Sequence, residues 1–395
     1  MDYITAREAA GKWGVSGRSI NYHLVAGRIP GAVKKGKLWL IPANAQRPAD
    51  KRRRGPALLE QVLSLSDDLY AIIAATAAPM PDHNPDAILD IACGEGARIH
   101  YEAELAYLRG DFARARGCFY RTEGDDTARL HVSTIAVGAA ISMGDYQAYM
   151  QMETYLNRCA KNSSDSIAVA MAELALSVIA VSCLAPNMAS EWLKEGDLSP
   201  VPVQMRAFAL YLRAKYLQCT GRYEAMLSVA QTALALSEPE RGISPTVLYL
   251  RLCCAMACHA LGQEEEARRH LLTAMRIALP HGFISPFAEV VTMLGGHVER
   301  CLEQEFPDRY DAVLEQWKRI FSNWVTFHNQ FTKDNITHIL TLREYHIAVL
   351  ISRRVPYAKV AEQHCVSVGR LKNIIQEIYG KLYISSRTQL AKHVL

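Results

Sequence analysis

The stretch "AYLRGDFARA" (residues 106–115) ends one helical pattern at a glycine and begins another within two residues. Equivalent breaks occur at "ISMGDYQAY" (141–149), "QCTGRYEAM" (218–226) and "HALGQEEEA" (259–267), with the turn glycines at 110, 144, 221 and 262. These glycines are 34, 77 and 41 residues apart, and Pro186 divides the long interval into 42 and 35 residues. A period of this length, built from helix pairs, is typical of an α-solenoid, in which each pair buries its apolar face against its neighbours.

Between the breaks, residues 56–334 carry long Ala- and Leu-rich segments with apolar residues three and four positions apart, as in amphipathic helices. Residues 101–278 resemble tetratricopeptide (TPR) repeats, with a turn glycine, then an aromatic or acidic residue, then an alanine where two helices approach closely. We therefore expect residues 85–332 to form a TPR-like helical repeat domain for sensing or interaction. Residues 51–84, which begin with the basic run "KRRRGP", are expected to form a linker and a connecting helix.

The charge of the chain is unevenly distributed. The 395 residues carry a net charge of +4, but residues 1–55 carry +9 and residues 335–395 carry +6, which leaves −11 on the remainder. Two basic ends around an acidic middle suit contact with a polyanion such as DNA. Charge alone is equally consistent with solvated faces, so the motifs at the two ends have to decide.

The C-terminal segment, residues 336–395, has the pattern of four short helices. Thr341 caps the first, Tyr357–His364 forms the second, Ser367 caps the third, and "SSRTQLAKHVL" (385–395) forms the last. The apolar residues that recur at the spacing of a buried helix face are Val360, Ala361, Leu371, Ile375, Ile378 and Leu382. This spacing leaves Arg370, Lys372 and Asn373 facing outward. Arg and Lys can bridge guanine acceptors, and Asn or Gln can pair with adenine, so these residue types suit the reading of bases.

The same segment strongly resembles the LuxR-type helix-turn-helix. The family pattern L-T-x-R-E, A-E, S-x-x-x-(V/L)-K, I-Y-x-K-L and R-T-x-L is matched across residues 339–393. Because the third helix of that family enters the major groove, the resemblance implies these DNA-binding residues: Ser367, Arg370, Lys372, Asn373, Gln376, Lys381 and Arg387. Of these, Lys381 and Arg387 either lie near phosphates or brace the bundle. The chain departs from the family at Gly369, Arg370 and Ile374, so the family's target site does not transfer.

The N-terminal segment contains "GAVKKGKLWL" (31–40), which matches most of a phosphate-binding loop through Gly31, Gly36 and Lys37. In such a loop a Ser or Thr follows the lysine and a helix begins at once. Here Leu38 replaces the hydroxyl residue, and a β-prone run follows. A hairpin with its turn at Lys35 and Gly36 is therefore the better interpretation.

Residues 1–50 resemble the winged helix-turn-helix of the MerR and excisionase superfamily. Ala9, Ala10 and Trp13 build a first helix, "GVS" (14–16) makes the turn, and residues 18–24 form a second helix. The Gly-Arg-Ile-Pro turn, basic ribbon and Trp-Leu-Ile-Pro ending follow at residues 27–42. The resemblance implies DNA contacts at Ser16, Arg18, Ser19, Asn21 and Tyr22 near the groove, and at Lys34, Lys35 and Lys37 on the wing. Phosphate contacts of the wing kind add affinity without sequence information.

Two further motifs allow other chemistries. "ILDIACGEG" (88–96) resembles the glycine-rich motif of adenosylmethionine-dependent methyltransferases, but that motif needs a preceding strand, and a helical repeat follows here. We expect Gly94 and Gly96 to form a loop or a small-residue contact between helices. Cys254 and Cys258 lie one helical turn apart in "RLCCAMACHALG" (251–262), yet cysteine on an Ala-rich helix packs as a small hydrophobe. No catalytic residue, cofactor or metal site is predicted.

The expected fold is therefore mainly α, a TPR-like α-solenoid flanked by an N-terminal winged helix-turn-helix with a small β-ribbon and a C-terminal four-helix LuxR-type helix-turn-helix. This order resembles MalT-like LuxR-family regulators without their ATPase module. It implies a bacterial transcriptional regulator, a homodimer that binds double-stranded DNA and whose repeats sense a ligand or protein partner. We expect a cytoplasmic protein without membrane contact, because no secretory leader or long apolar run is present. The alternatives are a DNA-bridging or excisionase-like architectural factor without an effector and, third, a methyltransferase.

Overall fold

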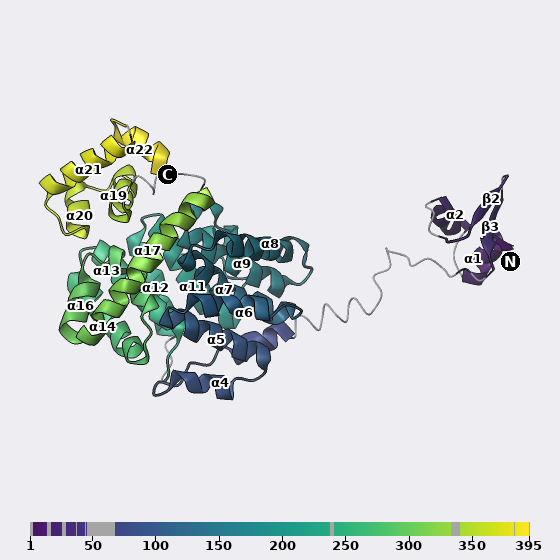
Figure 1. Cartoon of the computed structure of the whole chain (residues 1–395), viewed down its shortest axis with the longest axis horizontal. Coiled ribbons are helices and arrows are strands. Elements are labelled where there is room, and N and C mark those ends of the chain that lie inside the picture. Colours follow the sequence, from purple (N-terminus) through teal and green to yellow (C-terminus); the bar gives the residue numbers. More distant parts are fainter. Residues whose placement is uncertain are drawn as a thin grey trace. The chain divides into compact units, whose positions relative to one another are not determined.

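The chain divides into two compact units, Met1–Gln61 and Val62–Leu395, in this computed structural model. The structure describes residues 3–13, 17–25, 29–36, 38–43, 45, 68–237, 241–332, 340–382 and 384–394. As expected, these residues are mainly helical, with a small antiparallel sheet near the N-terminus (Figure 1). Within the described ranges, no helix is both long and apolar enough to cross a membrane.

The N-terminal unit combines two helices with a three-stranded sheet. Its elements are β1 (Tyr3–Thr5), α1 (Ala6–Trp13), α2 (Gly17–Val25), β2 (Val33–Lys35) and β3 (Leu38–Pro42), and the strand order is β1-β3-β2. The predicted hairpin is confirmed, because Lys35 lies opposite Leu38 and Gly36 turns the chain with a φ of +65° that suits glycine. The strand β1, in which Ile4 pairs with Ile41, was not predicted from the sequence. A small core between helices and sheet contains Ala9, Ile20, Leu24, Ile29 and Ile41.

The second unit is built mostly from helices joined in pairs by tight turns. After a helix at residues 68–75, these are α4 (Ile88–Ile91), α5 (Glu95–Arg109), α6 (Phe112–Arg121), α7 (Asp126–Met143), α8 (Tyr146–Asn162), α9 (Ser166–Ser182), α10 (Glu191–Glu195), α11 (Arg206–Cys219), α12 (Tyr223–Ser237), α13 (Pro245–Ala260) and α14 (Glu264–Ala278). The first helices of successive pairs, α5, α7, α9, α11 and α13, also pack side by side. They therefore present one common face.

The glycine turns follow directly from the local sequence. Gly110 and Gly144 adopt left-handed conformations, with φ of +85° and +68°, and their N–H groups close the last turns of α5 and α7. Asp111 and Asp145 then cap α6 and α8 by accepting hydrogen bonds from backbone N–H groups three residues further on, at 3.1 and 3.0 Å. A Cβ atom at Gly144 would lie 2.9 Å from the backbone oxygen of Asn323, so this turn also allows close packing.

The repeat pattern is irregular near Pro186 and at residues 88–96. The break predicted at Pro186 exists, but only a 3-10 turn (Pro186–Met188) and the five-residue α10 follow it. Residues 88–91 form α4, so the strand that a methyltransferase motif requires is absent at this described position. Gly96 instead makes the expected small-residue contact, since a Cβ atom there would lie 2.8 Å from Cδ1 of Ile72 and 3.2 Å from Cβ of Ala128.

The helical body, which begins at residue 68, ends with α15 (Ser285–Ala288), α16 (His297–Glu305) and α17 (Tyr310–Thr332). The long helix α17 (Figure 1) packs against α7 and α8. The remaining 3-10 turns are Pro85–Ala87, Val203–Met205, Leu279–His281, Val291–Met293 and Pro307–Arg309. A helical bundle follows, formed by α19 (Leu342–Ser352), α20 (Tyr357–Gln363), α21 (Val368–Leu382) and α22 (Arg387–Val394). The helices predicted there are confirmed, and Thr341 and Glu344 form a capping box at the start of α19. Leu184 and Trp324 of the body pack against the bundle's core.

Candidate functional site

Helix α21 separates a buried apolar face from an exposed polar one. Its buried residues, which share a core with α19 and α20, are Leu371, Ile374, Ile375, Ile378 and Leu382. Its exposed residues include Arg370, Lys372 and Asn373, which the helical spacing predicted to face outward, and Gln376, which was named from the family resemblance. Exposed Ser367 caps the helix, because its Oγ accepts a hydrogen bond from the backbone N–H of Arg370 at 3.1 Å.

Two other predicted residues hold the bundle together. Lys381 donates hydrogen bonds to both carboxylate oxygens of Glu344 at 2.7 Å. Although burial raises the pKa of Glu344, hydrogen bonds from Lys381 and Thr341 keep it below its usual value. Arg387 donates from Nε to the backbone oxygen of Ile351 at 2.5 Å. Of the two roles left open for Lys381 and Arg387, the structure therefore shows the bracing one.

The N-terminal unit exposes part of its predicted site. Asn21 on α2 and Lys34 and Lys35 on β2 are exposed, and Lys34 Nζ lies 5.9 Å from the ring centroid of Trp39. Two predicted residues, Ser16 and Lys37, lie outside the described residues. The side chains of Arg18, Ser19 and Tyr22 are likewise not described, although their backbones belong to α2.

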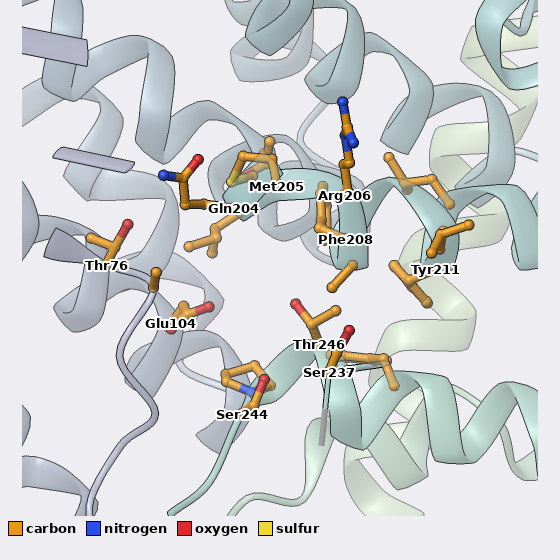
Figure 2. A pocket seen from close by; sticks show the side chains of 18 of the residues that line it. Thr76, Glu104, Gln204, Met205, Arg206, Phe208, Tyr211, Ser237, Ser244 and Thr246 are labelled. Atoms are coloured by element: carbon orange, nitrogen blue, oxygen red, sulfur yellow. The ribbon is translucent and has the colours of Figure 1, made fainter. Parts of the chain in front are cut away.

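The helical body contains a pocket of about 520 Å³ that the sequence analysis did not find (Figure 2). It lies on the common face of α5, α7, α9, α11 and α13. Its lining also includes residues from 73–79, the 3-10 turn Val203–Met205, the end of α12, Ser244 and Glu289. In Figure 2, Glu104 and Thr246 face the cavity from different helices, whereas the guanidinium of Arg206 points away from them. The signal in the sequence was only a scatter of polar and aromatic residues on otherwise apolar first helices.

One wall of this cavity is aromatic. Tyr107 donates a hydrogen bond from Oη to Oε1 of Glu289 at 2.8 Å. The ring centroids of Tyr211 and Tyr249 are 5.4 Å apart, and those of Phe208 and Tyr211 are 5.8 Å apart. Tyr107 thus connects this aromatic wall to a carboxyl group from a different part of the chain.

The titratable groups of the cavity are shifted toward their neutral forms. Burial raises the pKa of Glu104 to about 8 and that of Glu289 to about 7. Burial also lowers the pKa of His100 to about 4 and that of His131 well below its usual value. These two imidazoles stack with centroids 4.1 Å apart, and His131 Nε2 lies 2.6 Å from Oγ1 of Thr76. At neutral pH the two imidazoles are therefore uncharged, and the two carboxyl groups are at least partly protonated.

A second cluster lies among α13, α14 and α16, where His259, Glu264 and His297 converge. The Glu264 carboxylate is hydrogen-bonded to Nδ1 of His259, at 3.0 Å, and to Nε2 of His297. Two imidazoles and a carboxylate also form a ligand set that Zn²⁺ accepts. The hydrogen bonds to Glu264 are sufficient to explain why the three side chains meet. Cys254 and Cys258, considered above as ligands, are buried outside this cluster.

No family model, curated protein or solved structure shows a significant match to the chain. The function is therefore inferred from the residues of this chain.

Proposed function

We propose that the protein is a sequence-specific DNA-binding transcriptional regulator whose helical body senses a ligand. The observation that carries this proposal is the exposed face of α21, where Arg370, Lys372, Asn373 and Gln376 stand opposite a continuous buried row. An α-helix fits the major groove of B-DNA, where Arg and Lys pair with guanine and Asn and Gln pair with adenine. A helix held by its apolar face and carrying these four side chains suits that task.

In this proposal the C-terminal bundle is a LuxR-type helix-turn-helix, with α20 and α21 as its central pair. The N-terminal unit is a winged helix-turn-helix in which the β2–β3 hairpin is the wing. Exposed Lys34 and Lys35 on β2, together with the net charge of +9 on residues 1–55, support a contact with the phosphate backbone there. The helix pairs between these ends form a TPR-like solenoid, in keeping with the side-by-side packing of their first helices.

Selection of bound fragments from genomic DNA by the full-length protein tests the proposal. We expect one short motif to be strongly enriched, and a palindromic motif would indicate the homodimer. The variant Arg370→Ala/Lys372→Ala/Asn373→Ala should lose this enrichment. The control is Arg269→Ala, which removes an exposed arginine from α14.

The outcomes separate the proposal from its rivals. Retention of bulk DNA without an enriched motif would favour an architectural factor, since such a protein binds mainly the backbone. If no DNA is retained at low salt, both the regulator and the architectural factor are contradicted. Equal enrichment by the triple variant would show that α21 is not the reading helix.

A further inference from the structure

The lining of the cavity in the helical body favours one sign of charge. Two half-buried carboxyl groups, those of Glu104 and Glu289, line it. The imidazoles of His100 and His131 are neutral at physiological pH because burial lowers their pKa values. The arginine at the cavity, Arg206, is exposed and directs its guanidinium away from Glu104 (Figure 2). Among the described lining residues, the charge available to the cavity is therefore negative.

The aromatic residues concentrate around one of these carboxyls. Glu289 accepts the hydrogen bond from Tyr107, and its negative charge adds to burial in raising the pKa values of Tyr107, Tyr211 and Tyr249. The Glu289 carboxyl thus lies within electrostatic range of all three phenol groups. Ring faces carry negative potential, so a carboxylate among them strongly favours a cation at van der Waals distance.

Among the described residues, Lys215 is the cation whose charge acts on Glu289, whereas Tyr107 and Tyr249 act on it through hydrogen bonds. Lys215 donates to Oε1 of Gln218 at 2.7 Å, and its charge lowers the pKa of Glu289 by less than burial raises it. The carboxyl consequently retains capacity for a further positive partner.

We propose that this cavity binds an organic monocation, an amine or quaternary ammonium on an apolar body, with the positive charge held by Glu289 among Tyr107, Tyr211 and Tyr249. The inference deepens the sensing part of the proposed function and rests on it for its regulatory meaning. The volume of about 520 Å³ suits a small organic molecule. A bare metal ion would need several further oxygen ligands, whereas the tyrosine rings offer faces to an alkylated nitrogen.

Binding of a cation has a signature that binding of a neutral molecule lacks. Because burial raises the pKa of Glu289 to about 7, a sizeable share of this carboxyl is protonated at neutral pH. A cation favours the carboxylate, so the proton leaves to the buffer as the ligand enters. The measured enthalpy must then change between buffers of different ionisation enthalpy.

Isothermal titration calorimetry on the full-length protein at neutral pH tests the inference with three probes of similar size. Benzyltrimethylammonium should bind at least about tenfold more tightly than benzyl alcohol or benzoate, with release of protons. Glu289→Gln should weaken this binding by about tenfold or more, while Glu266→Gln, an exposed carboxyl on α14, should leave it unchanged. Tyr211→Phe should retain binding because the ring remains, and Tyr211→Leu should lose it. Circular dichroism checks that each variant is folded.

The alternative results distinguish failure of the cation site from failure of the proposed function. Equal or tighter binding of benzyl alcohol would identify the occupant as neutral, and tighter binding of benzoate would identify it as an anion. Failure of all three probes to bind would remove the cation site altogether. Cation binding by a protein that selects no DNA motif would contradict the regulator and leave this site intact. Selection of a motif without any preference among the probes would contradict the site alone.

Discussion

The face of α21 and the cavity of the helical body use charged side chains in opposite ways. Arg370 and Lys372 are exposed and stand on a single helix. Glu104 and Glu289 are largely withdrawn from water and come from segments 185 residues apart in the chain. Exposed cations keep their charge and can reach a large polyanion, whereas buried carboxyls change protonation with their surroundings. In the proposed function, the exposed face of α21 contacts DNA, and the carboxyl groups of the cavity change protonation when a ligand binds.

The largest expected effect concerns α21. The double variant Arg370→Ala/Lys372→Ala should lower affinity for the selected DNA motif by about 3 kcal/mol, because each base contact contributes roughly 1–3 kcal/mol. Its affinity for benzyltrimethylammonium should not change. Gel-shift titration and calorimetry on the same sample measure both, and a parallel loss of the two activities would break the separation between the regions.

The next effect is the pH dependence of stability that Glu104 confers. A carboxyl with a raised pKa stabilises the folded state at low pH and loses this contribution as pH rises toward the raised value. Glu104→Gln should therefore become more stable, relative to the wild type, by about 2 kcal/mol between pH ~6.5 and ~8. His100 and His131 titrate below this window because their pKa values are lowered.

The matched control for Glu104→Gln is Glu102→Gln, two residues away on α5. Hydrogen bonds from Arg121 and Arg114 outweigh burial and keep the pKa of Glu102 below its usual value. Glu102→Gln should therefore show no change relative to the wild type over the same pH window. Urea denaturation at several pH values gives both curves. Parallel curves for wild type and Glu104→Gln would show that Glu104 is ionised throughout.

A smaller effect distinguishes residues of α21 that hold the helix from residues that face outward. Ser367→Ala removes the hydroxyl that accepts the N–H of Arg370, and it should lower the free energy of unfolding by about 1 kcal/mol. Ser367→Thr keeps an equivalent acceptor and should recover most of this loss. Thermal denaturation measures both variants. Loss of DNA affinity in Ser367→Ala without any loss of stability would assign the hydroxyl to the DNA instead.

The smallest effect concerns the N-terminal hairpin. Lys34→Ala should weaken DNA binding only a few-fold, equally for all sequences, and should reduce the slope of log affinity against log salt by about 1. Gel shifts at several salt concentrations with the selected motif and a scrambled duplex measure the slope. An unaltered slope would contradict a phosphate contact at Lys34.

The parts of the fold that were predictable from sequence depend on neighbouring residues. Gly144 and Asp145 end one helix and cap the next through contacts within a few positions, and Thr341 and Glu344 likewise cap the start of α19. The hairpin likewise follows from a short basic turn. The strand β1 was missed because its three residues pair with β3, more than thirty positions away.

The same distinction between neighbouring and distant residues applies to the candidate site. The outward residues of α21 follow from helical spacing alone, so their positions were predictable. The cavity was not predictable, because Glu104 looks like any solvated acid on a helix until Tyr249 and Glu289 are brought to the same face. Only the packing of several helices creates the low-polarity surroundings that shift its pKa.

Trp324 on α17 has a position with a practical consequence. Its Nε1 donates a hydrogen bond to the backbone oxygen of Ser182, a residue of the cavity wall, at 3.0 Å. The same ring packs against the core of the C-terminal bundle, with its centroid 6.3 Å from that of Tyr345. Indole emission depends on the polarity and hydrogen bonding around the ring. Once the other four of the chain's five tryptophans are replaced by phenylalanine, Trp324 is therefore an intrinsic fluorophore that contacts both the cavity wall and the C-terminal bundle.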